Sequence, residues 1–201
     1  EYSLSRMSPA DYIRDARWEA LGGGVRRDKV TLPYPGVGRP GGPMFGEKAR
    51  WLDGPDLPKL FEKVDWRRTA LLSHNIGFDG AILAWRYGIT PALYIDTLGM
   101  CRAMLPDAKG ASLSKALAHI GAPPKGTAIE QARGMRLADI KARPAYYKEY
   151  TEYAARDCDG SFWLFEHLAH GLNGTDGVGT VHKFEESLLM DSVARMTIVP
   201  Q

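Results

Sequence analysis

The chain has 201 residues, of which 44% are hydrophobic and 25% charged, and its net charge is +2. These values exclude a low-complexity chain and a strongly acidic or polybasic one, but they allow a local basic groove for nucleic acid. Two cysteines, Cys101 and Cys158, are too few for a disulfide scaffold and favour a reducing compartment. No apolar run approaches the roughly 18 residues of a membrane span, so we expect no membrane partner. Because the chain begins with Glu1 and stops abruptly at Gln201, we expect it to be a piece of a longer protein.

The first third of the chain predicts a pair of strands. Residues 22–25 and 29–32 are apolar or glycine-rich, and a polar segment at 26–28 separates them, as in a short hairpin. Residues 33–46 are rich in proline and glycine and predict a loop.

The middle of the chain alternates short apolar runs with helical periodicity. Alternation of strands and helices favours an α/β fold with helices covering a sheet. We expect strands at 69–72 and 92–95, and helices at 56–64, 79–87, 97–105, 112–120, 144–170 and 181–196. Asp96 stands just before the helix at 97–105 and is expected to cap it.

Asp79 is the first acidic residue with an unusual position. The segment from His74 to Asp79 marks the end of a buried strand and the start of a helix. Ligand sites gather at strand ends in open α/β sheets. The alternative is that Asp79 only caps the helix, and the residues alone favour that alternative.

Tyr153 and Asp157 form the second unusual position, inside the long helix. Their spacing of four places them one turn apart on the same face. Aspartate is a poor helix former, and this one lies beside the apolar stripe instead of on the solvated face. A carboxylate that is partly buried there would need a cation.

Carboxylates from separate elements suggest hard metal ions. Mg²⁺ and Mn²⁺ prefer carboxylate and water ligands, and two such ions can clamp both oxygens of a phosphodiester displacement. Two carboxylates are too few for such a site, so this interpretation predicts additional acids.

The order of these residues resembles a known family. Asn75-x-x-Phe78-Asp79 resembles the second motif of DEDD-type 3′–5′ exonucleases, and Tyr153-x-x-x-Asp157 resembles their third motif in its tyrosine variant. The intervening matches are Tyr94-Ile95-Asp96-Thr97-Leu98, Ser112-Leu113 and Lys125-Gly126. Together they are similar to the proofreading exonuclease domain of bacteriophage family A DNA polymerases.

The resemblance implies a ribonuclease H-like mixed sheet flanked by helices. It implies an exonuclease domain over 1–172, a glycine-rich linker over 173–180 and the start of a polymerase region over 181–201. The family's first motif, Asp-x-Glu on the first central strand, has no counterpart before residue 75. We therefore expect this chain to lack that strand and to be inactive by itself.

The resemblance also implies roles for the site residues. Asp79 and Asp157 would bind two Mg²⁺ or Mn²⁺ ions, and Tyr153 would orient the attacking water. Asn75 and Phe78 would contact the terminal nucleotide, although Phe78 fits a core aromatic equally well. The expected partners are a single-stranded DNA 3′ end and a polymerase domain of the same parent chain, in the cytoplasm of a bacterial or phage-infected cell. The product would be 5′-mononucleotides.

Two alternatives stay open. A non-catalytic scaffold that binds DNA within a polymerase would also lack carboxylates. A dinucleotide-binding oxidoreductase is suggested only by a G-x-G-x-x-G match at 36–41, which is crowded by prolines. Candidate cations for DNA binding, each also typical of an ordinary surface, are Arg67, Arg68, Lys109, Lys125, Arg133 and Arg136.

Overall fold

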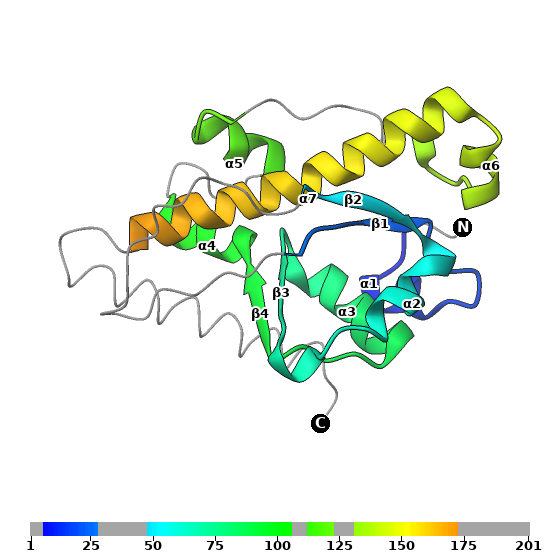
Figure 1. The fold of residues 1–201 in the computed structure, drawn as a ribbon, viewed down its shortest axis with the longest axis horizontal. Helices are drawn as coiled ribbons and strands as arrows, with labels where there is room; N and C mark the ends of the chain where they lie inside the picture. Colours follow the sequence, from blue (N-terminus) through cyan, green and yellow to red (C-terminus); the bar gives the residue numbers. More distant parts are fainter. Residues whose placement is uncertain (1–5, 28–47, 106–111, 123–130, 173–201) are drawn as a thin grey trace.

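The computed structural model describes residues 6–27, 48–105, 112–122 and 131–172, which form a mixed α/β arrangement (Figure 1). In chain order the elements are α1 Pro9–Arg14, β1 Gly22–Val25, β2 Arg50–Asp53, the 3₁₀ turn η1 Gly54–Asp56, α2 Leu57–Phe61, the 3₁₀ turn η2 Trp66–Arg68, β3 Ala70–Ser73, α3 Ile76–Tyr87, β4 Leu93–Asp96, α4 Thr97–Met104, α5 Leu113–His119, α6 Leu137–Lys141 and α7 Pro144–Leu172.

The described strands form two separate pairs. β1 and β2 are antiparallel, with Gly22 opposite Asp53 and Val25 opposite Arg50. β3 and β4 are parallel, with Ser73 opposite Asp96 at their carboxyl ends. Within the described residues the strands thus form two separate two-stranded sheets, and the single mixed sheet that we expected is not seen there.

Helix α7 connects the two sheets. It contacts β1, β2 and β3, and also α4, α5 and α6. Figure 1 shows it as the longest element, with α6 at its start and α4 and α5 toward its end. β1 lies very close to it: a Cβ placed on Gly24 would overlap the carbonyl oxygen of Ala154 and lie 3.2 Å from the Cβ of Cys158. The absence of a side chain at Gly24 thus allows the strand to approach the helix backbone.

The core is divided among three hydrophobic clusters. One lies between α4, α5 and α7, around Cys101, Leu164 and Leu168. A second joins α1, α3 and β4 around Ile13. A third joins α6 to the start of α7 around Ile140. The parallel pair lies between the first two clusters, so β3 and β4 are supported from both.

Most of the predicted elements are present, with three corrections. β1 pairs with β2 at Arg50–Asp53, a strand that the pattern missed, and the predicted partner at 29–32 lies outside the described residues. The short helices α1 and α6, of six and five residues, were also missed. α3 begins at Ile76, three residues earlier than expected, so Asp79 is not its cap.

The predicted linker at 173–180, the helix at 181–196 and the glycine motif at 36–41 lie outside the described residues. Within the described ranges, no helix combines the length and the apolar character that crossing a bilayer demands.

Candidate acidic site at the ends of β3 and β4

Asp79 lies at the carboxyl edge of the parallel sheet. The chain leaves β3 at Ser73 and enters α3 through Asn75, whose φ of 72° is in the left-handed region. Within the described residues Asn75 is the one non-glycine with positive φ, which is costly for an ordinary side chain. This tight turn places Asp79 in the first turn of α3, where the Ser73 hydroxyl donates a hydrogen bond to its Oδ2.

A second carboxylate, Asp96, ends the neighbouring strand. Its Oδ1 accepts hydrogen bonds from the backbone N–H of Leu98 at 3.0 Å, as expected for the cap of α4. The same oxygen also accepts from the N–H of Asn75 at 2.9 Å and of Ile76 at 3.3 Å. The expectation of a cap is therefore confirmed, and the structure adds that Asp96 holds the start of α3.

Charge and solvation at this edge oppose the ionised form of Asp79. Asp79 is an exposed residue, and the protein atoms packed around its carboxyl desolvate it enough to raise its pKa. The Ser73 hydroxyl acts against this rise, whereas the negative charge of Asp96 adds to it. In the described part of the chain, no Lys or Arg forms an ion pair with either carboxylate.

Helix α7 contacts β3, the strand that leads into the turn before Asp79. The pKa of the Cys158 thiol rises to about 11, first through desolvation and then through the charge of Asp159, with a smaller contribution from Asp79. Asp79 therefore lies within electrostatic reach of the residue that directly follows Asp157. Asp157 is half-buried, and its backbone carbonyl accepts a hydrogen bond from Ser161 Oγ at 3.0 Å.

Tyr153 lies one turn before Asp157 on α7, as predicted, and is only 3% exposed. The structure thus brings Asp79 and Asp96 together at one edge of the parallel sheet. Tyr153 and Asp157 lie on α7, a helix that also contacts β3.

Two predicted nucleotide contacts differ in exposure. Asn75 is exposed, and its side chain makes no capping hydrogen bond to α3, so its amide group faces solvent at the edge. Phe78 is half-buried and packs against the cluster of Ile13, Ile76 and Tyr94. Packing favours the core interpretation of Phe78 over the substrate-contact one.

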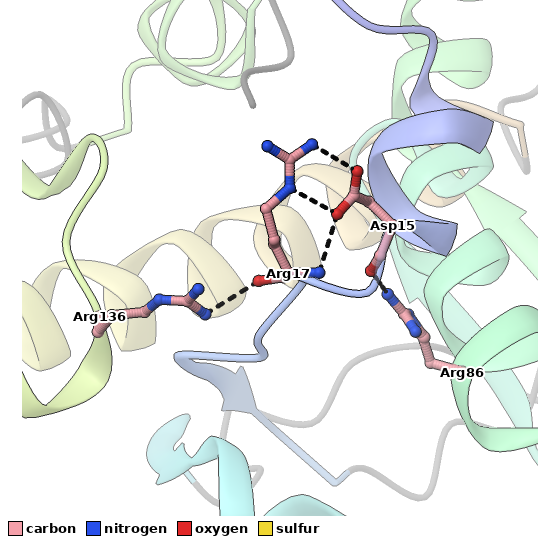
Figure 2. Close-up of polar contacts among 4 residues, drawn as sticks. All are labelled: Asp15, Arg17, Arg86 and Arg136. Atoms are coloured by element: carbon pink, nitrogen blue, oxygen red, sulfur yellow. Dashed lines mark hydrogen bonds and ion pairs between the residues drawn. The ribbon is translucent and has the colours of Figure 1, made fainter. Parts of the chain in front are cut away.

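One of the predicted DNA-binding cations, Arg136, is engaged in a contact within the fold. Arg136 donates to the carbonyl of Arg17 and to Glu19, both at 2.9 Å. In Figure 2, Arg136 and Arg86 hold the turn after α1 from opposite sides, Arg86 by donating to the carbonyl of Asp15. Arg17 also binds the Asp15 carboxylate, which holds the pKa of that carboxyl far below its usual range. These arginines are therefore part of a structural clamp.

The other candidate cations lie on the surface or outside the described residues. Arg67 pairs with Asp65 at 3.2 Å on the surface, and Arg68 and Arg133 are exposed. Lys109 and Lys125 lie outside the described residues.

The described residues do not complete a metal site. In the ranges that the structure describes, no three His, Cys, Asp or Glu side chains converge as potential ligands. Asp79 and Asp157 are of the right chemical type for Mg²⁺ or Mn²⁺, but a two-metal centre needs more oxygen donors. The donor set present here does not fit two metal ions by itself.

Sequence reasoning missed two features of this site. Ser73 was not singled out, and Asp96 was assigned only to α4. The signal was available: each predicted strand is followed directly by a polar residue, and parallel strands bring their carboxyl ends to one edge. Applying that rule to both strands places Ser73 and Asp96 side by side.

Comparison with known proteins adds no relative. A scan against protein-family models, a search of curated proteins and a search of solved structures each returned no match for this chain.

Proposed function

We propose that this chain is part of a metal-dependent 3′–5′ exonuclease that removes 5′-mononucleotides from DNA 3′ ends, as the proofreading part of a phage-type DNA polymerase. The observation that carries the proposal is Asp79, a carboxylate beside a second carboxylate at the ends of two parallel strands. Its ionised form is disfavoured where it lies, and such groups concentrate at functional sites.

Electrostatics favours a cation-dependent reaction on an anionic substrate. Carboxylates alone repel a phosphodiester, so cleavage near Asp79 and Asp157 requires cations between protein and substrate. Oxygen donors favour Mg²⁺ or Mn²⁺. Because the described residues are too few to hold them, further acids must come from elsewhere in the protein, as the Asp-x-Glu motif of the resembled family would supply.

The arrangement of strands also supports the ribonuclease H-like interpretation. An antiparallel pair and a parallel pair that share one covering helix are what such a mixed sheet leaves when its first central strand is missing. In this interpretation Tyr153 is a neutral phenol that orients water by hydrogen bonding and does not abstract a proton.

The test uses 5′-labelled single-stranded DNA with Mg²⁺ and then with EDTA. The protein is assayed as this chain and as a form extended upstream by about 20 residues, enough for a complete strand with its turns. We expect the extended form to produce a ladder that shortens from the 3′ end and stops with EDTA, and this chain alone to leave DNA intact.

A matched pair of variants on α7 locates the reaction. Asp157→Asn should reduce cleavage by several orders of magnitude, whereas Glu152→Gln removes a charge from the exposed face of the same helix and should leave cleavage unchanged. DNA that is bound but never cut by the extended form would favour the scaffold alternative. A chain that neither binds nor cuts DNA would overturn both.

A further inference from the structure

Asp96 lies between Asp79 and the start of α4, at the carboxyl ends of β3 and β4; we call Asp79 and Asp96 the acidic site. Asp96 ends β4 directly opposite Ser73, the last residue of β3. Three backbone N–H groups donate to the same carboxylate oxygen: those of Asn75, Ile76 and Leu98, at 2.9, 3.3 and 3.0 Å. One side chain therefore satisfies the starts of two helices, α3 and α4.

The start of α3 depends on this support from outside the helix. The first N–H groups of a helix have no partner within it, and they are normally satisfied by the residue that caps it. The capping position here is Asn75, whose side chain makes no such bond. Asn75 also holds a left-handed backbone, which persists only when surrounding contacts impose it. Asp96 provides two of those contacts.

The position of Asp79 follows from this turn. Asp79 lies three residues after Ile76, and its carboxylate accepts from Ser73, which the β3–β4 register places opposite Asp96. A shift of the turn would move both the helix that carries Asp79 and the hydroxyl that orients it.

We propose that Asp96 is a positioning residue of the acidic site: it fixes the turn between β3 and α3 and thereby places the Asp79 carboxylate. The expected effect on cleavage rests on the proposed function. The claim that Asp96 fixes the turn between β3 and α3 does not depend on it. Asp96 acts on the turn as a hydrogen-bond acceptor, so the position of the turn depends on the acceptor oxygen and not on the negative charge.

Two substitutions separate the acceptor from the charge. Asp96→Asn keeps an acceptor at Oδ1 and loses the charge, whereas Asp96→Ala loses both. The control is Asp65→Ala, which removes another capping side chain: Asp65 accepts from the N–H of Arg67 at the start of η2, at 3.2 Å. The variants are made in the form extended upstream, and circular dichroism establishes that each one folds.

Two measurements are made on each variant. The first is kcat and KM for cleavage of single-stranded DNA in Mg²⁺. The second is amide hydrogen exchange at Asn75, Ile76, Leu98 and Asp79 by NMR, which reports on the turn without any substrate.

We expect Asp96→Ala to lower kcat by about 10²-fold with little change in KM, since a small misplacement of a reacting group has that effect. It should also lose exchange protection at Asn75 and Ile76 and shift the Asp79 amide. Asp96→Asn should retain protection and stay within about 10-fold of the wild-type kcat. Asp65→Ala should change neither measurement.

Three results would decide against the inference or separate it from the proposed function. Full activity and protection in Asp96→Ala would overturn it. Equal loss of activity in both Asp96 variants, with protection kept in Asp96→Asn, would overturn it in favour of a direct role for the charge. If the wild-type protein cuts no DNA, the proposed function fails, and the exchange data still decide whether Asp96 holds the turn.

Discussion

The carboxylates near the two sheets differ in the charge of their partners. Near β1 and β2, Asp53 forms an ion pair with the Lys141 ammonium, and Asp159 forms one with Arg26 at 2.8 Å. At the ends of β3 and β4, Asp79 accepts a hydrogen bond from the Ser73 hydroxyl, and Asp96 accepts from backbone N–H groups. Neither carboxylate pairs with a cation from the described residues. Both regions have carboxylates at or beside strand ends, but among the described residues only those near β1 and β2 form ion pairs with Lys or Arg.

The pKa shifts follow this difference. Desolvation raises the pKa of Asp53, but hydrogen bonds from Lys141, Trp51 and Tyr147 outweigh it, so the net shift is downward. The pKa of Asp79 is raised, because desolvation and Asp96 outweigh Ser73. An ionised Asp53 therefore stabilises the fold, whereas an ionised Asp79 opposes it. Asp53 therefore contributes to stability, whereas Asp79 is retained at some cost in stability.

The largest expected effect concerns activity. Asp79→Asn in the extended form should lower DNA cleavage by at least about 10²-fold while leaving unfolding stability equal or higher, because it removes an unfavourable charge. Asp53→Asn should do the reverse, with lower stability and cleavage near the wild-type rate. Cleavage rates and thermal melting of both variants check this contrast, which fails if Asp53→Asn is the less active of the two.

The buried ion pair at the first sheet gives the next effect. The side chains of Arg26 and Asp159 are 7% and 17% exposed, and Arg26 also lies over the ring of Phe162 at 4.0 Å. Arg26→Met leaves Asp159 without its cation and should destabilise the protein by about 3 kcal/mol in urea unfolding.

Arg67→Met is the control for that measurement. Arg67 pairs with Asp65 on the surface, where their side chains are 91% and 47% exposed, so its loss should cost less than about 1 kcal/mol. Equal costs for the two arginine substitutions would mean that burial does not distinguish the pairs.

The close contact between β1 and α7 gives a smaller effect. Gly24→Ala places a Cβ against the carbonyl oxygen of Ala154 and should destabilise the protein by about 2 kcal/mol through overpacking. Gly23→Ala is the matched neighbour, since its new Cβ would lie 3.7 Å from Leu57 Cδ2, an ordinary contact. We expect it to change stability by less than about 0.5 kcal/mol, and chemical denaturation of both variants measures the difference.

The smallest expected effect concerns pH: the stability difference between wild type and variant should change with pH in opposite directions for Asp53→Asn and Asp79→Asn. Asp53 has a lowered folded pKa, so the stability of wild type over Asp53→Asn is present above the unfolded pKa of about 4 and disappears as pH falls through the folded value. Asp79 has a raised folded pKa, so wild type loses stability relative to Asp79→Asn as pH rises from about 4 through the folded value. Each difference should stay near or below about 1 kcal/mol, and urea unfolding between pH 3 and about 7 measures both. Parallel profiles for the two variants would contradict the opposite electrostatics of the two sheets.

Local patterns predicted the elements that were long or clearly bounded. Helix α7 was found because its apolar residues share one stripe and Pro144 suits its first turn. β3 and β4 were found because they are short apolar runs that end in polar residues. These signals depend on neighbours in sequence, which a single chain displays directly.

The missed features depend on partners far away in the chain. β2 is recognisable as a strand only beside β1, because Arg50–Asp53 mixes charged and apolar residues. Asp96 was predicted as a cap from its local position, but its bonds to Asn75 and Ile76 cross 21 and 20 residues. Asp79 was favoured as a cap because the helix start was placed too late; the left-handed turn at Asn75 moves that start to Ile76. Its proposed role as a metal ligand stays a prediction.

The late place of α7 in the chain has a consequence during synthesis. About 120 residues separate the end of β1 at Val25 from Pro144, yet β1 packs directly on α7. At a translation rate of about 5–20 residues per second, a ribosome needs on the order of 10 s to deliver that helix. During this interval β1 is made first, β2 and α4 follow, and all three wait for the helix against which they pack. A chaperone that binds the faces that this helix covers would therefore act before residue 144 emerges, and chains released earlier could not assemble the two sheets around their common helix.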